Sequence, residues 1–302
     1  MNACSIACLI SALCFLTPAA RSQESTSVGG YGELHYNEPD GNTNGTLDLH
    51  RFVLYVGHTF NEKLAFKSEL EVEHTKIEAG EPEGGEVAVE QAYLDWHLSN
   101  LLGLRAGVLL PPVGILNQIH EPPTFHGVER PALDEVIIPT TWRESGIGIY
   151  GTLAEGVKYQ LYIVAGLKAE GLSENGIRGG RQEALQSSAV NPSFTGRIEA
   201  LPVLGLQCGA SFFAGRTSGG IDSLGGGMLT LLSADAQFTS GALSIKGVGV
   251  LESIGEAEKI NAAFHRDVAD QIYGLSLEGA YNILPLLAPE AEEQSLHLFA
   301  RY

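Results

Sequence analysis

The sequence predicts an all-β protein whose fold is a transmembrane antiparallel β-barrel. Two observations support this fold class. Charged and apolar residues alternate over stretches of roughly ten residues, about the length that a tilted strand needs to cross hydrocarbon. Short and long connections between these stretches also alternate, as they do in a barrel that has tight turns at one end and long loops at the other.

The stretch FKSELEVEH, residues 66–74, has the clearest alternation. Lys67, Glu69, Glu71 and Glu73 occupy every second position, and apolar side chains stand between them. Successive side chains of a strand point to opposite faces, so one face is charged and the other is apolar. The alternation leaves open whether the apolar face meets lipid or a protein core. A soluble β-sandwich or β-solenoid is therefore an alternative.

The same alternation recurs along the chain and gives thirteen candidate strands, seven before residue 167 and six after it. The first seven begin near residues 31, 49, 64, 87, 104, 146 and 157. The last six are expected at residues 194–200, 206–214, 228–238, 242–251, 271–284 and 295–302. Tight connections such as 61–63, 99–100 and 154–156 separate long ones such as 37–46, 76–86 and 167–193.

The composition excludes several other classes of protein. The chain has 302 residues, 18 Lys+Arg against 36 Asp+Glu and a formal net charge of -18. This acidic balance argues against a nucleic-acid partner, because few basic groups are available to neutralise phosphates. After the N-terminal segment no stretch approaches roughly eighteen consecutive apolar residues, so a mature chain in a membrane must cross it as strands.

Residues 1–22 are predicted to be a secretory signal peptide, which leaves residues 23–302 as the barrel. The segment is apolar up to Ala20 and then turns polar after small residues, which places cleavage after Ala20 or Ser22. Its first residues include no Lys or Arg, so a single-span anchor is the alternative.

No metal, cofactor or catalytic site is predicted. Three of the four cysteines lie in the signal segment, so Cys208 alone remains and can form neither an internal disulfide nor a cysteine metal site. His120 and His126 are six residues apart with prolines between them, which does not fit a helical zinc motif. The glycine-rich stretches 176–182 and 219–227 are expected to be outer loops. No Gly-x-Ser-x-Gly elbow supports a hydrolase, so we expect no enzyme.

The connection at residues 111–143, PPVGILNQIHEPPTFHGVERPALDEVIIPTTWR, is too long for an ordinary loop. Its prolines and aromatic residues lower the entropy that such a long excursion loses on folding. We therefore expect it to fold into the barrel, with an outer cap as the alternative. The residues expected near the narrowest point are Glu121, Arg130, Trp142, Arg143 and Glu144.

This loop resembles the long inward-folded loop of the phosphate-selective porin O and P family of Gram-negative outer membranes. The resemblance extends through GYGELHY, LDLHRFVLYVGHTFNEKLAFKSELEVEH, EQAYLDWHL, GIRGGRQ and TGRIEALPVLGLQCGASFF, over most of residues 29–215. It implies a barrel of about sixteen strands in the outer membrane. It also implies a homotrimer that passes small hydrophilic solutes or ions by diffusion. Thirteen strands is an odd number, so the chain is either C-terminally incomplete or closes with Tyr302 as its terminal aromatic.

Charged side chains on one face of the strands are expected to line the channel, because charge on the lipid face costs ~2–4 kcal/mol at the bilayer midplane. Phosphate selectivity is not expected, because residues 62–90 hold nine Glu against three Lys. We expect weak charge selectivity, tilted towards cations at low salt. The candidate lining residues are Arg51, Lys67, Arg105, Lys158, Arg197 and Lys246, and Glu69, Glu71, Glu73, Asp95, Glu199 and Glu278.

The function expected from these observations is passive diffusion of small hydrophilic solutes or ions through an outer-membrane porin. The expected surroundings are outer-membrane lipid, small solutes or ions and further copies of the chain. One alternative is a non-transport outer-membrane barrel with a plugged lumen, such as an adhesin or a structural surface protein. A soluble periplasmic β-protein is a further alternative.

Overall fold

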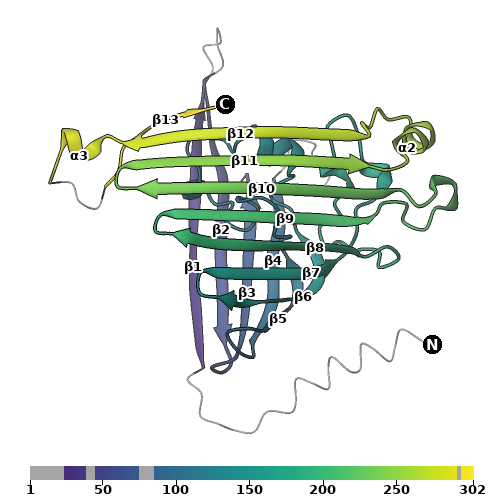
Figure 1. The fold of residues 1–302 in the computed structure, drawn as a ribbon, viewed down its shortest axis with the longest axis horizontal. Coiled ribbons are helices and arrows are strands. Elements are labelled where there is room, and N and C mark those ends of the chain that lie inside the picture. Colours follow the sequence, from purple (N-terminus) through teal and green to yellow (C-terminus); the bar gives the residue numbers. More distant parts are fainter. Residues whose placement is uncertain (1–23, 39–44, 75–84, 291–293) are drawn as a thin grey trace.

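The protein is one antiparallel sheet of thirteen strands in a computed structural model that describes residues 24–38, 45–74, 85–290 and 294–302 (Figure 1). The strands follow one another in the sheet in chain order, so each pairs with its neighbours in sequence. The predicted signal peptide, residues 1–22, lies outside the described residues. The strands are β1 (Ser25–Asn37), β2 (Thr46–Thr59), β3 (Leu64–Glu73), β4 (Glu86–His97), β5 (Gly103–Leu109), β6 (Glu144–Ala154), β7 (Val157–Val164), β8 (Ser193–Val203), β9 (Leu206–Arg216), β10 (Met228–Ser240), β11 (Leu243–Ile254), β12 (Gln271–Asn282) and β13 (His297–Arg301).

The predicted strands are confirmed in number and order, and each candidate stretch overlaps one observed strand. The stretches 242–251, 271–284 and 295–302 extend one to two residues beyond their strands, β11, β12 and β13. Helices are short in the part of the chain that the structure describes. They are η1 (Pro122–Thr124), η2 (Leu133–Ile137), η3 (Ala169–Gly171), η4 (Arg178–Gly180), η5 (Asp222–Leu224), α2 (Ala257–Phe264) and α3 (Leu284–Leu287). Among the described residues, no helix combines the length and the apolar character that a membrane crossing requires.

The sheet curls strongly along its width. In Figure 1 the first strands run upright while β10–β12 run across the view, so the sheet wraps around an interior. Cumulative twist between neighbouring strands produces such curvature. β1 and β13 are the first and last strands in the order of the sheet. The connections that follow β5 and β7 are long, and both enter the enclosed space.

The outer face of the sheet is apolar and exposed. Phe52, Leu161, Ile245 and Leu277 are 49%, 46%, 42% and 55% exposed, although they come from four different strands. Their neighbours along each strand point to the other face, as the period of two requires. Charged side chains are buried on that inner face, which reverses the polarity of a soluble protein. An apolar outer face and a charged interior are typical of a membrane barrel.

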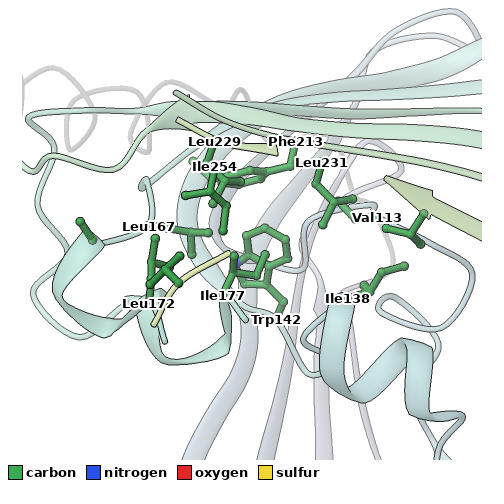
Figure 2. Close-up of a cluster of buried hydrophobic side chains, with 14 of the residues drawn as sticks. Val113, Ile138, Trp142, Leu167, Leu172, Ile177, Phe213, Leu229, Leu231 and Ile254 are labelled. Atoms are coloured by element: carbon green, nitrogen blue, oxygen red, sulfur yellow. The ribbon is translucent and has the colours of Figure 1, made fainter. Parts of the chain in front are cut away.

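An apolar core lies inside the curved sheet, between β9–β11 and the two long connections (Figure 2). Trp142, at the end of the first connection, packs against Phe213 of β9 with ring centroids 4.4 Å apart. Leu172 and Ile177 of the second connection are completely buried in the same cluster. Each such side chain contributes about 1.5–3 kcal/mol when it leaves water. The core therefore fixes both connections to the inner face of the sheet.

The second connection differs from its prediction. Residues 176–182 were expected to be an outer loop, but Ile177 and Gln182 are buried against the inner core. The side-chain amide of Gln182 donates to the carbonyl of Gly166 at 2.6 Å, and its backbone N–H donates to the carboxylate of Glu144 at 2.9 Å. The glycine content suggests an exposed loop, whereas here the glycines permit close backbone packing, as at Gly179, where an added Cβ would clash with the carbonyl oxygen of Gly171.

Candidate pore constriction

The connection at residues 110–143, here called the constriction loop, lies against the inner face of the sheet. The hydroxyl of Tyr55 on β2 donates to Glu121 Oε1 at 3.2 Å. Near the other end of the sheet order, His126 Nδ1 lies 2.8 Å from Glu278 Oε1 on β12. The loop therefore spans the interior from one side to the other. The prediction of an inward-folded loop is confirmed.

Asn117 closes the neck of the constriction loop. Its side-chain amide donates to the carbonyl of Pro111 at 2.7 Å and to that of Trp142 at 3.0 Å. Its carbonyl Oδ1 accepts the backbone N–H of Trp142 at 2.7 Å. Asn117 is fully buried, and these three bonds join the beginning of the loop to its end. A single Asn in a long connection gave no sequence signal for this role.

A buried charged cluster attaches the middle of the loop to β3 and β4. His120 Nε2 lies 2.6 Å from Glu90 Oε2 and 3.8 Å from Glu69 Oε1. Arg143 Nη1 lies 3.6 Å from the other oxygen of Glu90. Burial lowers the pKa of His120, but the hydrogen bond and the charge of Glu90 outweigh it, so the pKa is raised above its usual value. The cluster therefore stabilises a charged imidazole beside the carboxylates.

Glu90 reaches this cluster because of a β-bulge. Gln91 pairs with Glu69 and Val89 pairs with Leu70, so Glu90 is the extra residue on β4. A bulge re-aims the side chain of its extra residue, and Glu90 is completely buried. Strict alternation would place Glu90 on the lipid face. The sequence does contain a signal, because the apolar positions change phase between Val87/Val89 and Ala92/Leu94.

β2 contains a bulge of the same kind. Arg51 pairs with Glu33 and Leu49 pairs with Leu34, so His50 is the extra residue. The apolar positions again change phase, from Leu47 and Leu49 to Phe52 and Leu54, which is the signal that sequence analysis missed. The two bulges lie on the half of the sheet that faces the loop's charged cluster.

Several predicted lining residues form buried ion pairs on the inner face. Arg51 Nε lies 2.8 Å from Glu33, and Arg51 Nη1 donates to Glu71 at 3.1 Å. Arg197 makes two bonds to Asp235, at 2.6 and 2.8 Å. Such two-pronged pairs fix the guanidinium in the wall.

Other predicted lining residues form the wall on the short-turn side of the loop. Arg105 Nε donates to Asp95 at 3.2 Å, and its guanidinium lies 4.2 Å from the ring centroid of Tyr150. The hydroxyl of Tyr150 also donates to Asp95. Lys67 Nζ lies 3.8 Å from Asp95, while its side chain is 55% exposed. This exposure makes Lys67 accessible from the interior space.

The remaining predicted lining residues differ in how tightly they are held. Lys158 is exposed, and Glu73 is half-buried. Glu199 lies 3.6 Å from Arg197, and Lys246 Nζ donates to the carbonyl of Thr124 at 3.4 Å. The sixth acidic candidate, Glu278, is buried and paired with Arg301 Nη2 at 2.6 Å.

The predicted loop residues fall into two groups. Trp142 and Glu144 are completely buried, so they anchor the loop and contribute no surface to an open passage. Arg143 is also largely buried, in the cluster with Glu90. Glu121 and Arg130 are half-buried and lie further along the inner surface of the sheet.

A cavity of about 340 Å³ lies between the loop and the long-loop ends of β1 and β2. Its charged lining residues are three arginines and three glutamates, together with two histidines. Arg51 and Glu33 come from the sheet, whereas the other charged groups come from the two long connections. Positive and negative groups thus face one space. The charged lining residues are Glu33, Arg51, Glu129, Arg130, Glu135 and Arg178, and the histidines are His35 and His50.

Sequence comparison relates the chain to a protein of Aquifex aeolicus. A protein of Aquifex aeolicus (strain VF5), described as uncharacterized, is 40% identical over 307 residues, covering 95% of this chain and 68% of the relative. No protein-family model matches the chain.

Structure comparison relates the fold to outer-membrane channels. OmpF of Salmonella typhi, solved in complex with daunomycin, has a TM-score of 0.55 at 11% identity and covers 86% of this chain and 75% of its own. The anion-selective porin from Comamonas acidovorans has a TM-score of 0.55 at 13% identity, with 92% and 78% covered. The channel DcaP of Acinetobacter baumannii has a TM-score of 0.51 at 12% identity, with 88% and 76% covered. At these identities the likeness shows the fold.

Proposed function

Because the chain belongs to the same family as the Aquifex aeolicus protein and has the fold of outer-membrane porins, we propose that it is itself a porin. It is a passive diffusion channel of the outer membrane for small hydrophilic solutes or ions. It acts without catalysing a reaction.

The observation that carries this proposal is the charged cavity beside an inward-folded loop. Arg51, Arg130 and Arg178 face Glu33, Glu129 and Glu135 across about 340 Å³. Charge enclosed by an apolar outer face is costly unless water reaches it or an opposite charge pairs with it. A water-filled passage through the interior would hydrate these charged side chains, whereas a lipid-filled or fully packed interior would not.

The selectivity of this channel is weak. The cavity contains equal numbers of arginines and glutamates, and the predicted lining set has six basic and six acidic members. Opposed charges of this kind create a field across the passage without a strong preference for one ion. The chain's net charge of -18 tilts the preference towards cations at low salt.

The resemblance to the phosphate-selective porin O and P family extends the proposal to assembly. We propose a homotrimer on the strength of that resemblance, and mass measurement in detergent tests it. The resemblance is not extended to phosphate selectivity, because the inner arginines Arg51 and Arg197 are already paired with carboxylates.

A second candidate function is a non-transport barrel with a plugged lumen. The apolar core around Trp142, Phe213 and Ile177 supports it, because this core fills the interior beside β9–β11. The two candidate functions differ in one respect: a porin requires a continuous passage between the core and β1–β3, and a plugged barrel has none.

Conductance of the purified protein in a planar lipid bilayer separates these candidates. The porin predicts stepwise, ohmic current. Deleting residues 118–138 preserves Asn117 and Trp142 at the loop's neck, and it should raise the single-channel conductance severalfold. A current that is absent in the full chain and appears only in the deletion variant would favour the plugged barrel and contradict the porin.

A further inference from the structure

Three histidines gather at the long-loop ends of β1–β3, and the proposed channel function does not explain them. His35 lies on β1, His50 on β2 and His74 directly after β3. The rings of His35 and His50 are stacked with centroids 4.2 Å apart, and those of His50 and His74 are 5.6 Å apart. No metal motif is visible in the sequence here, because the three positions are distant in the chain.

Asp48 completes one set of possible ligands within this cluster. Asp48 Oδ2 lies 2.9 Å from His74 Nδ1 and 3.5 Å from His50 Nδ1. One ligand atom from each of the three side chains lies within 4.8 Å of the others. Tetrahedral ligands about 2.1 Å from a zinc ion are ~3.4 Å apart. The three side chains therefore need only small movements to surround an ion.

The local backbone explains why these ligands converge. Because His50 is the extra residue of the bulge on β2, its side chain leaves the strict alternation of the strand and points to the same side as Asp48. The backbone N–H of His74 donates to the carbonyl of His50 at 3.2 Å, which holds the end of β3 beside β2. The arrangement is thus built by strand pairing.

Two other groups of possible ligands are already committed to ion pairs. Glu33 lies near His35 and His50, but Arg51 holds one of its oxygens at 2.8 Å. The group of Glu69, Glu90 and His120 attaches the constriction loop through the 2.6 Å pair. The carboxylate of Asp48, in contrast, lies beside His50 and His74, and a metal ion bound to all three side chains can replace these hydrogen bonds.

We propose that Asp48, His50 and His74 bind a divalent transition-metal ion of the zinc class. Two imidazoles favour zinc or copper over calcium or magnesium, which prefer oxygen ligands. Three protein ligands leave a fourth position for water or a solute, so that fourth ligand is exchangeable. His50 also lines the charged cavity, which places the bound ion at its margin.

Calorimetric titration of the metal-free, folded full chain with Zn²⁺ tests this site without requiring conduction. We expect one Zn²⁺ per chain at neutral pH. His74→Gln and Asp48→Asn should each weaken binding at least about tenfold. The matched control is His97→Gln, an exposed histidine at the short-turn end of β4, which should leave the affinity unchanged.

His35→Gln distinguishes the proposed ligand group of Asp48, His50 and His74 from the group of Glu33, His35 and His50. It should leave zinc binding intact. Copper added in place of zinc should give an electron paramagnetic resonance signal of two coordinated nitrogens, which His74→Gln reduces to one. Zinc binding that survives both His74→Gln and Asp48→Asn, or that is lost in His35→Gln alone, would overturn the proposal.

Discussion

Glu252 is a buried acid on the inner face of β11. It is completely buried, and neither of its carboxylate oxygens has a hydrogen-bond partner among the described residues. Its strand neighbours are Leu231 and Ile272. A buried polar group without a partner costs about 1–3 kcal/mol. Glu252→Leu should therefore stabilise the fold by an amount of that order.

The midpoint temperature at which the folded, detergent-resistant band disappears on gel electrophoresis measures this change. Glu278→Leu is the control, because it removes an acid that pairs with Arg301 and His126 and should destabilise the protein. Glu252→Leu lowering the midpoint as Glu278→Leu does would mean that Glu252 has a partner outside the described residues.

Removal of one acidic or one basic side chain from the channel wall should shift the ion preference in opposite directions. Glu71→Gln removes a negative charge beside Arg51 and should reduce the tilt towards cations. Arg105→Gln removes a positive charge beside Asp95 and should increase the tilt. The reversal potential under a tenfold KCl gradient measures both. Strong anion selectivity that persists at high salt would show that other basic residues dominate the passage.

At the scale of elements, the constriction loop contains a carboxyl group that makes its attachment depend on pH. Burial of Asp134 in η2 raises its pKa from 3.8 to about 7. A group whose folded pKa exceeds its unfolded value contributes stability below the unfolded pKa, and this contribution is lost as pH rises through the folded value. The loop should therefore become less stable between about pH 4 and pH 7.

Asp134→Asn should flatten this part of the stability profile, because the amide does not ionise. Thermal midpoints of the two proteins across that pH range test it. His120, whose pKa is also raised, remains in both proteins, so the difference between them isolates Asp134. Parallel profiles would contradict the assignment.

The strands were predictable from sequence because their signal is local. Alternation of period two fixes which residues of FKSELEVEH share a face, and all thirteen strands followed from it. The bulges at His50 and Glu90 were not predicted, because an extra residue exchanges the inward and outward positions along the rest of the strand. The hydrogen bonds by which Asn117 closes the neck of the constriction loop join distant positions, which alternation does not encode.

At the scale of the whole molecule, the curved sheet has the inverted polarity of a membrane barrel. Apolar side chains such as Phe52 and Leu277 are exposed on the outer face, where the proposed function places lipid, while Arg51 and Glu71 lie inside. Outer-membrane channels with this fold cover most of the chain. The predicted boundary between residues 1–22 and 23–302 stays a prediction, and N-terminal sequencing of the mature protein tests it.

Cysteine labelling at two neighbouring positions of β3 tests whether the inner face of the sheet meets water and the outer face meets lipid. In a Cys208→Ser background, Lys67→Cys places a thiol on the inner face and Phe66→Cys places one on the outer face. A charged, water-soluble thiol reagent added to the protein in a planar bilayer should lower the current through Lys67→Cys and leave Phe66→Cys unchanged. Modification of Phe66→Cys instead, with no effect on Lys67→Cys, would contradict a water-filled interior surrounded by lipid.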